Sequence, residues 1–201
     1  MSSWDSGSLG PPIVAVEVDI YTGGYRVVGH MLTRFRRVAD ILNLTGSSHL
    51  IIEEATVTEY AAPAAAQSAP QVMVAVDTVL FGISSGTDDR PSDELRIQKR
   101  PVQAQIAMPP FWLRGNVHVP QGSRPMDGLL NVADRFLPLT DVSVTSHSVA
   151  GFDRSAPVLA VQRMLAQVLV VSDDEAPDEL LADVMPEEQA RGWLPPEERP
   201  L

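Results

Sequence analysis

The chain of 201 residues is long enough for one large domain or two small ones, and its formal net charge is −11 at pH 7. It contains no cysteine, which excludes a disulfide framework and a thiolate metal site. The charge is concentrated in residues 173–201, where ten acidic residues stand against two arginines. A general binder of the phosphate backbone needs a basic surface, so nucleic acid is not the favoured partner.

No apolar run approaches the roughly 18 residues that a membrane-spanning helix needs. The first seven residues also lack the basic start and apolar centre of a signal peptide. We therefore expect a cytoplasmic protein that does not insert into a membrane. Its arginines far outnumber its single lysine, Lys99, a bias that indicates a GC-rich bacterial genome.

The chain begins with a segment, 1–11, that is rich in serine and glycine and is expected to be a flexible arm. Over 13–20, apolar β-branched residues alternate with polar ones, as in a half-buried strand. A Gly-Gly pair at 23–24 predicts a tight turn into a second strand over 25–32. Gly29 lies inside that strand and indicates a bend or a bulge.

The hydrophobic period then changes to that of a helix over 35–44, with the charged residues mostly on the far side. Strand patterns return at 49–58 and 71–83, on either side of an Ala/Pro/Ser loop. The polar residues 84–101 contain glycine and proline and predict a linker. The same order then follows a second time, with strands at 102–107, 111–119, 136–145 and 158–171 and a short helix near 125–131.

A diverged copy of residues 29–58 returns at 115–145, and Ser68-Ala69-Pro70 has a counterpart in Ser155-Ala156-Pro157. The offset between matching residues stays between 86 and 88. A repeat of this length predicts one structural unit written twice. We therefore expect a mainly β protein with two tandem repeats, each a small curled sheet or barrel with one short helix between its second and third strands.

The expected division is a flexible arm (1–11), a first β repeat (12–83), a linker (84–101), a second β repeat (102–172) and an acidic, proline-rich tail (173–201). Because bare edge strands invite aggregation, we expect the two copies to pair edge to edge, to pack face to face, or to oligomerise. The expected core is formed by Val14, Val16, Val18, Ile20, Val72, Val74, Val76, Val142, Val144, Phe35, Leu42, Leu129 and Leu130.

Inside the acidic tail lies an apolar cluster, which is typical of a segment that orders on a partner. The predicted partner-binding residues of the tail are Leu180, Leu181, Val184, Met185, Trp193 and Leu194. A second candidate site is the arginine cluster Arg34, Arg36 and Arg37, which could bind an anion but which the second copy does not keep as a cluster. A solvated helix face is the favoured interpretation of these arginines.

Catalytic and metal-binding motifs are absent from the sequence: it has no phosphate-binding loop, G-x-S-x-G, H-E-x-x-H or G-x-G-x-x-G. The histidines His30, His49, His118 and His147 are not spaced as metal ligands. The carboxylates Glu54 and Asp141, and Asp40 and Asp127, recur between the copies, and we expect them on exposed strand faces and at helix ends. No catalytic residue, cofactor or metal is therefore expected.

The strands V-E-V-D-I-Y-T-G-G-Y-R-V-V-G-H-M-L, L-I-I-E-E-A-T-V-T and V-M-V-A-V-D-T-V-L-F-G-I resemble a small β-barrel of the Sm-like or SH3-like kind. The chain departs from Sm-like domains by its short helix and lacks their RNA-contacting signature, so the resemblance implies the fold and no RNA site. The pattern R-x-x-D-x-L-N with a later L-T-D is also similar to that of uncharacterised bacterial domains.

The leading hypothesis for function is a non-catalytic interaction scaffold, adaptor or assembly subunit that docks onto protein partners through its sheets and its acidic tail. One alternative is a regulator that binds nucleic acid or a nucleotide through the arginines near the first helix. Another is a barrel that binds a small molecule or catalyses a reaction with His30, His118 or the pair Asp40 and Asp127.

Overall fold

The computed structural model describes residues 12–44, 46–85 and 98–172. Its helices and strands are β1 (Val14–Thr22), β2 (Tyr25–Thr33), α1 (Val38–Leu44), β3 (His49–Glu59), β4 (Gln67–Ala75), β5 (Val79–Ser84), β6 (Lys99–Met108), β7 (Phe111–Pro120), α2 (Pro125–Leu130), β8 (Phe136–Ser146), β9 (Asp153–Gln162) and β10 (Val168–Ser172). Single 3₁₀ turns lie at η1 (Pro63–Ala65), η2 (Val76–Thr78) and η3 (Arg163–Leu165). The expected arm and acidic tail lie outside the described residues.

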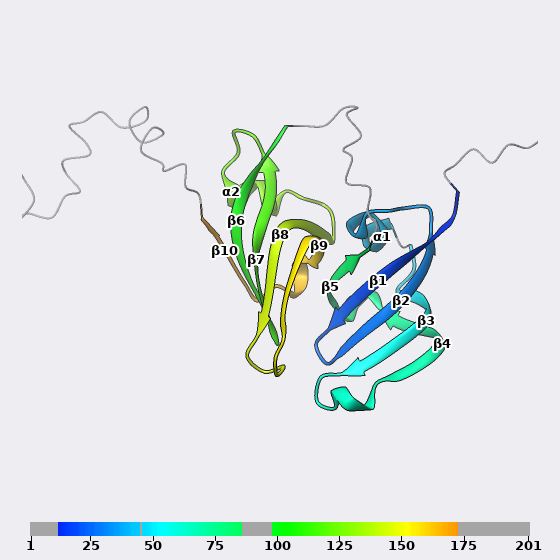
Figure 1. Cartoon of the computed structure of the whole chain (residues 1–201). Helices are drawn as coiled ribbons and strands as arrows, with labels where there is room; N and C mark the ends of the chain where they lie inside the picture. The colour runs from blue at the N-terminus through cyan, green and yellow to red at the C-terminus, as the bar shows by residue number, and fades with distance from the viewer. Residues whose placement is uncertain (1–11, 45, 86–97, 173–201) are drawn as a thin grey trace, which may run out of the picture. The chain divides into compact units, whose positions relative to one another are not determined.

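The ten strands form one antiparallel sheet in the order β10-β6-β7-β8-β9-β5-β1-β2-β3-β4, and the predicted mainly β class is confirmed. In each half of the chain the fifth strand lies beside the first, and the first four follow one another as a meander (Figure 1). The halves meet where β5 pairs with β9, with Phe81 opposite Val161 and Gly82 opposite Ala160.

The apolar runs 71–83 and 158–171, each expected to be one strand, are in fact two strands separated by a 3₁₀ turn. After η2 the N–H of Val79 donates to the carbonyl of Val76, and after η3 the N–H of Ala166 donates to that of Arg163. The turn redirects the chain, so the second part of the run pairs with the first strand of its half. The polar pairs Asp77-Thr78 and Gln162-Arg163 stand at the two breaks, but two polar residues between apolar segments do not by themselves distinguish a turn from a continuous strand.

Both predicted helices form, but the first begins at Val38 and not at residue 35. Phe35 therefore precedes the helix and is 39% exposed, and the prediction that it lies in the core is wrong. The same prediction is wrong for Leu130, which is 69% exposed at the end of α2 while Leu129 beside it is buried. Neighbouring residues of a helix point about 100° apart, so a helix of six residues buries only one narrow face.

A bulge interrupts the ladder between β2 and β3, as Gly29 led us to expect: Glu54 and Ala55 together lie opposite this single glycine. Glu54 has a φ of 48°, and a β-carbon on Gly29 would lie 2.6 Å from the carbonyl oxygen of Glu53. Only glycine fits this close approach of two backbones. The bulge bends β3 and increases its twist.

The ladder between β7 and β8 has the same irregularity, with Asp141 and Val142 opposite Gly115. Asp141 has a φ of 53°, close to that of Glu54. Glu54 and Asp141 are both exposed, as predicted, and each lies in a bulge.

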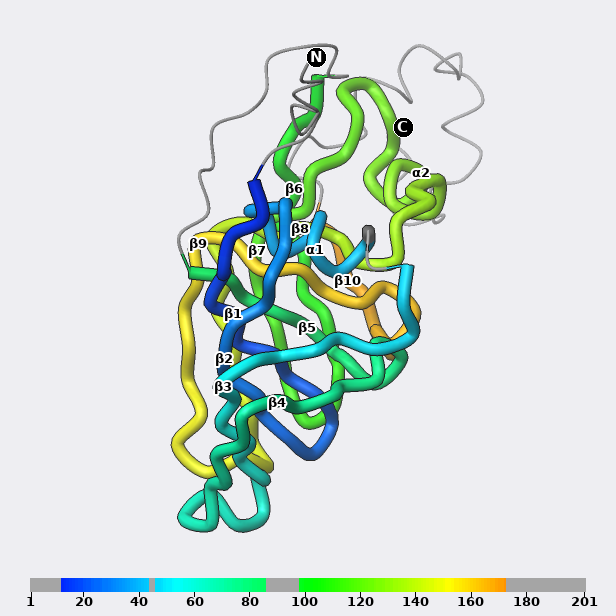
Figure 2. Tube along the Cα trace, turned by 90° about the vertical axis from the view of Figure 1, so that its right-hand side faces the viewer, coloured from blue at the N-terminus to red at the C-terminus, as the bar shows by residue number. Residues whose placement is uncertain are grey.

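The two halves share their hydrophobic cores. The cluster built mainly from the first half includes Phe136 and Ala160 of the second, and the cluster built mainly from the second half includes Tyr21, Leu80 and Phe81 of the first. Helix α1 lies against β8 and β9 (Figure 2). All the core residues predicted above are buried except Phe35 and Leu130, which are exposed, and Val14 and Val72, which are half-buried.

The boundaries of the predicted linker, 84–101, change at both ends. Ser84 is the last residue of β5, and Lys99, Arg100 and Pro101 belong to β6. Most of the residues between these strands lie outside the described part of the chain. In the turn between β6 and β7, where Pro109-Pro110 replaces the Gly-Gly pair, the peptide bond between the two prolines is cis.

Candidate functional site

The junction of the two halves holds a group of charged side chains around Asp19 of β1. Arg26 of β2 donates two hydrogen bonds to its carboxylate, each 2.8 Å long. Arg154 of β9 also donates to Asp19, and the hydroxyl of Tyr21 donates to it at 2.9 Å. One carboxylate thus accepts from two guanidinium groups and a phenol, and it links three strands across the junction.

Both Tyr21 and Arg26 are held in one protonation state by this arrangement. Burial, together with the negative charge of Asp19, raises the pKa of Tyr21 to about 12. The hydrogen bond to Asp19 raises the pKa of Arg26 above its already high ordinary value. Neither group exchanges a proton near neutral pH, so neither is suited to general acid–base catalysis. The group acts as a structural ion cluster.

Aromatic rings close the junction behind Tyr21. Its ring stacks on Phe81 at a centroid distance of 4.4 Å, and Phe111 of β7 meets both rings edge to face. Tyr60 meets Phe111 in the same way and donates a hydrogen bond of 2.8 Å to the carbonyl of Tyr25. Such contacts stabilise a packed core, and here they join rings from both halves.

An open hollow of about 490 Å³ lies over the ion cluster, lined by Glu17, Asp19, Arg26, Val28, Ile83, Ser84, Ser85, Arg154, Ser155, Ala156 and Pro157. The hydroxyl of Ser84 is buried there without a hydrogen-bond partner. No histidine is among the lining residues, and the carboxylate of Asp19 already accepts hydrogen bonds from Arg26, Arg154 and Tyr21. The two arginines are already paired with Asp19.

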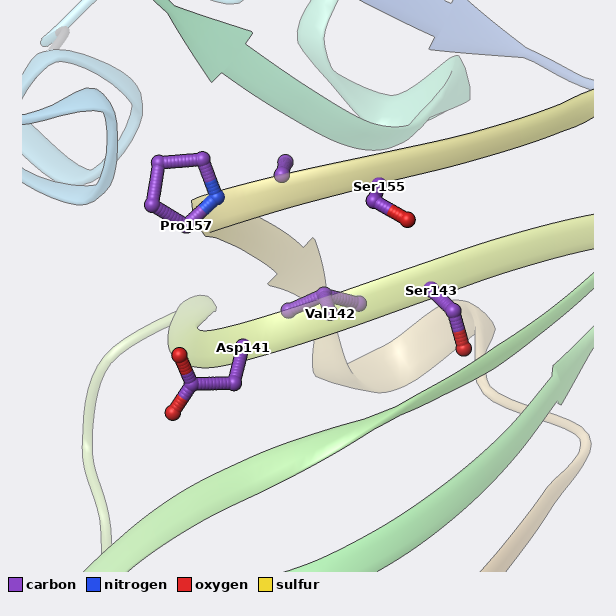
Figure 3. Close-up of a pocket in the computed structure, with 6 residues that line it drawn as sticks. Asp141, Val142, Ser143, Ser155 and Pro157 are labelled. Carbon is purple, nitrogen blue, oxygen red and sulfur yellow. The ribbon is translucent and has the colours of Figure 1, made fainter.

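A second open hollow, of about 350 Å³, follows the bulge at Asp141. Figure 3 shows Asp141 and Ser143 on β8 beside Ser155 and Pro157 on β9. The carboxylate of Asp141 accepts a hydrogen bond of 3.2 Å from the side chain of Asn116. This hollow also lacks a histidine among its lining residues.

The predicted anion-binding residues do not lie on a helix face. Because α1 begins only at Val38, they lie in the segment between β2 and α1: Arg34, Arg36 and Arg37. Arg34 and Arg36 are exposed, and Arg37 is half-buried. The predicted partner-binding residues of the tail, from Leu180 to Leu194, lie outside the described residues. Asp40 and Asp127 each lie in the first turn of their helix, where a negative charge is favourable.

The histidines are dispersed over the described strands. His30 lies 3.9 Å from the carboxylate of Glu54, His49 contacts the hydroxyl of Ser48 at 2.9 Å, and His118 contacts that of Thr140 at 3.0 Å. Among the residues that the structure describes, no three His, Cys, Asp or Glu side chains are grouped to hold a metal ion. No helix in this part of the chain has the length and hydropathy to cross a membrane.

His118 is expected to make stability depend on pH. Burial, with a smaller contribution from Lys99, lowers its pKa below the ordinary value of 6.5. Below pH 6.5 the unfolded chain therefore binds more protons than the folded chain, so the free energy of unfolding falls as the pH drops through 6.5 toward the lowered pKa. We expect the His118→Gln variant to lose less stability between pH 7.5 and 5 than the original chain, as measured by urea unfolding.

The His147→Gln variant is the matched substitution, made at an exposed position after β8. The slope of the His118→Gln variant is compared with the slope of this variant as well as with that of the original chain. Equal slopes for the original chain and the His118→Gln variant would contradict the assignment to His118.

Two groups of exposed apolar side chains were not predicted from the sequence. The first, which we call the β3–β4 surface, consists of Ile51 and Met73, which face each other on neighbouring strands. The second is the set of exposed apolar residues on α2, η3 and β10, which we call the α2–β10 surface: Met126, Leu130, Met164, Val168 and Val170. The signal for the second was the uncharged run V-L-V-V at 168–171, which sequence reasoning placed inside one strand, 158–171.

The β3–β4 surface lies at one end of the sheet and the β10 part of the α2–β10 surface at the other. In the described part of the chain, neither β4 nor β10 has a neighbouring strand on its outer side. Each therefore presents unpaired backbone N–H and C=O groups next to apolar side chains.

Comparisons of the chain with protein-family models, curated proteins and solved structures found no match.

Proposed function

We propose that the protein is a non-catalytic interaction scaffold or assembly subunit that binds protein partners through the ends of its sheet. The observation that carries this proposal is the presence of exposed apolar side chains at both sheet ends: Met73 is 64% exposed and Val168 is 49% exposed. Apolar side chains that gather at an uncovered position typically mark a contact with another protein. An unpaired edge strand adds backbone hydrogen bonds to such a contact.

The chemistry of the remaining surface supports the same proposal. Asp19, Arg26 and Arg154 at the junction are paired with one another, and neither hollow has a histidine among its lining residues. The β10 sequence V-L-V-V-S has no charge and no proline, the two devices that most often protect an edge strand. An edge of this composition is best explained by a partner that covers it.

We further propose that each half is a small curled unit of the Sm-like or SH3-like kind, in a cytoplasmic bacterial protein. The pairing of the fifth strand with the first in each half supports this, as do the bulges at Gly29 and Gly115. The acidic tail, 173–201, is proposed as a second docking segment through its apolar residues.

The test is affinity capture from a nuclease-treated native lysate with the tagged full chain. Three further baits are compared with it: the truncation 1–172, the double variant Ile51→Lys/Met73→Lys, and Trp112→Lys. Trp112 is an exposed apolar residue of β7 outside both surfaces, so it controls for the added charge. We expect the double variant to lose captured proteins, or copies of the chain itself, that Trp112→Lys retains.

Proteins lost with the truncation alone would assign the contact to the tail. The proposal fails if the full chain captures no protein, including its own untagged copies. Binding that nuclease treatment abolishes would instead favour nucleic acid.

A further inference from the structure

The contact between the two halves has two different sides. One side consists of β5 and α1 of the first half, and the other consists of β9 and β8 of the second half. Strand β5 adds to the edge of β9, and α1 covers the neighbouring face, where Ala160 and Phe136 join the core of the first half. The side chain of Asn43 donates to the carbonyl and accepts from the N–H of Phe136, each at 2.8 Å.

Strand β4 holds the place in the first half that β9 holds in the second. Ile52 lies opposite Val72 in the β3–β4 ladder, and Leu139 lies opposite Leu159 in the β8–β9 ladder. Adding 87 to the residue numbers of the first pair gives those of the second. The first strand of each ladder, β3 or β8, also contains a bulge opposite a glycine of the preceding strand, Gly29 or Gly115. By this register Met73 is the counterpart of Ala160.

Strand β10 likewise holds the place of β5. Both follow a 3₁₀ turn, and the turns end with the same hydrogen bond, at Val79 and at Ala166, again 87 residues apart. By this shift Val168 is the counterpart of Phe81. The same face of each strand is turned to the core. A β-carbon on Gly82 would contact core residues of the first half, and the side chain of its counterpart Leu169 packs against the core of the second half.

Two of the exposed apolar residues, Met73 and Val168, lie at the counterparts of residues that the internal contact buries. Ala160 and Phe81 are fully buried, while their counterparts Met73 and Val168 are the exposed residues described above. Helix α2, the counterpart of α1, exposes Leu130 in addition. One end of the chain therefore presents the β9-like side of the contact, and the other end presents the β5-like side.

We propose that copies of this chain assemble head to tail, with the α2–β10 surface of one copy on the β3–β4 surface of the next. The inference rests on the proposed function and names the partner as a second copy. Strand β10 would extend the sheet beyond β4, as β5 extends it beyond β9, and α2 would cover Met73, as α1 covers Ala160. Because the two surfaces differ, the contact is heterologous and repeats into a ring or a filament.

The contact between copies should depend little on salt. Asp77 and Arg135 form an ion pair across the internal contact, but at a shift of 87 residues their counterparts are Met164 and Ser48. The apolar Met164 is 74% exposed. An apolar contact is screened far less by salt than an ion pair is.

The test uses the full chain, which has no cysteine of its own. In the internal contact Gly82 lies opposite Ala160, and the counterparts of these two residues are Leu169 and Met73. Two variants, Met73→Cys and Leu169→Cys, are treated with a short bismaleimide, each alone and then as an equal mixture. Head-to-tail assembly predicts covalent dimers in the mixture at a yield at least tenfold above that of either variant alone.

A second measurement guards against loss of folding in these variants. The variant Val170→Lys places a charge on the exposed side of β10, and Trp112→Lys carries the same change outside both surfaces. Val170→Lys should abolish self-association in light scattering, while Trp112→Lys should leave it intact; both should keep the circular dichroism of the original chain.

The outcomes separate this inference from the proposed function. Equal dimer yields in a single variant and in the mixture would indicate a symmetric contact and would overturn head-to-tail assembly. A monomeric full chain that still captures another protein through the β3–β4 surface would also overturn it, while leaving the proposed function in place.

Discussion

Replacing Gly29 with alanine is expected to lower the free energy of unfolding by about 3 kcal/mol. The new β-carbon would lie 2.6 Å from the carbonyl oxygen of Glu53 and 2.7 Å from a methyl group of Ile52. The carbonyl belongs to the backbone of the bulge and cannot rotate away as a side chain would. The measurement is urea unfolding followed by circular dichroism.

Gly24→Ala is the matched control, because a β-carbon at Gly24 would have no atom within 4 Å. Its stability should change by less than about 1 kcal/mol. Gly115→Ala should fall between the two, since its closest contact, at 2.9 Å, is a side-chain methyl group of Val142. Equal effects of the Gly29 and Gly24 substitutions would show that the bulge does not require glycine.

The second large effect is expected at Asp19. Replacing it with asparagine should cost about 2–3 kcal/mol, because Arg26 and Arg154 then lose the carboxylate that neutralises them in a partly buried position. The loss should appear in one cooperative transition of the whole sheet, since Arg154 comes from the second half and Asp19 from the first.

Asp77→Asn is the control for Asp19, because Asp77 also pairs with an arginine across the junction. Its side chain is 81% exposed, whereas that of Asp19 is 14% exposed. An exposed ion pair contributes about 0–1 kcal/mol. If the two variants unfold at the same urea concentration, the ion cluster around Asp19 does not stabilise the junction.

The element types could be predicted from the sequence because each depends on local chemistry. Alternation of apolar residues predicts β1 and β8. Gly29 inside β2 indicates a bulge, but only the observed pairing of β2 with β3 shows that Glu54 and Ala55 lie opposite it. The pairing of strands depends on distant contacts. In the run 71–83 the polar pair Asp77-Thr78 coincides with the turn, but no local pattern indicates that the second part of the run lies between β1 and β9.

The candidate surfaces were missed for the same reason. Met73 and Val168 belong to apolar strand patterns, and Leu130 was predicted to lie in the core. They are exposed because they lie at the two ends of the sheet, which only the strand order reveals. The ion cluster was also invisible, since Asp19 and Arg154 are 135 residues apart in the chain.

The most direct test of the account is the mass of the full chain in solution, measured by sedimentation equilibrium over a wide range of concentration. The account predicts species that are multiples of the 21.8 kDa chain mass, little changed between low and high salt and lost in the Val170→Lys variant. A mass of 21.8 kDa at every concentration would contradict the account's claim that the two sheet ends bind each other.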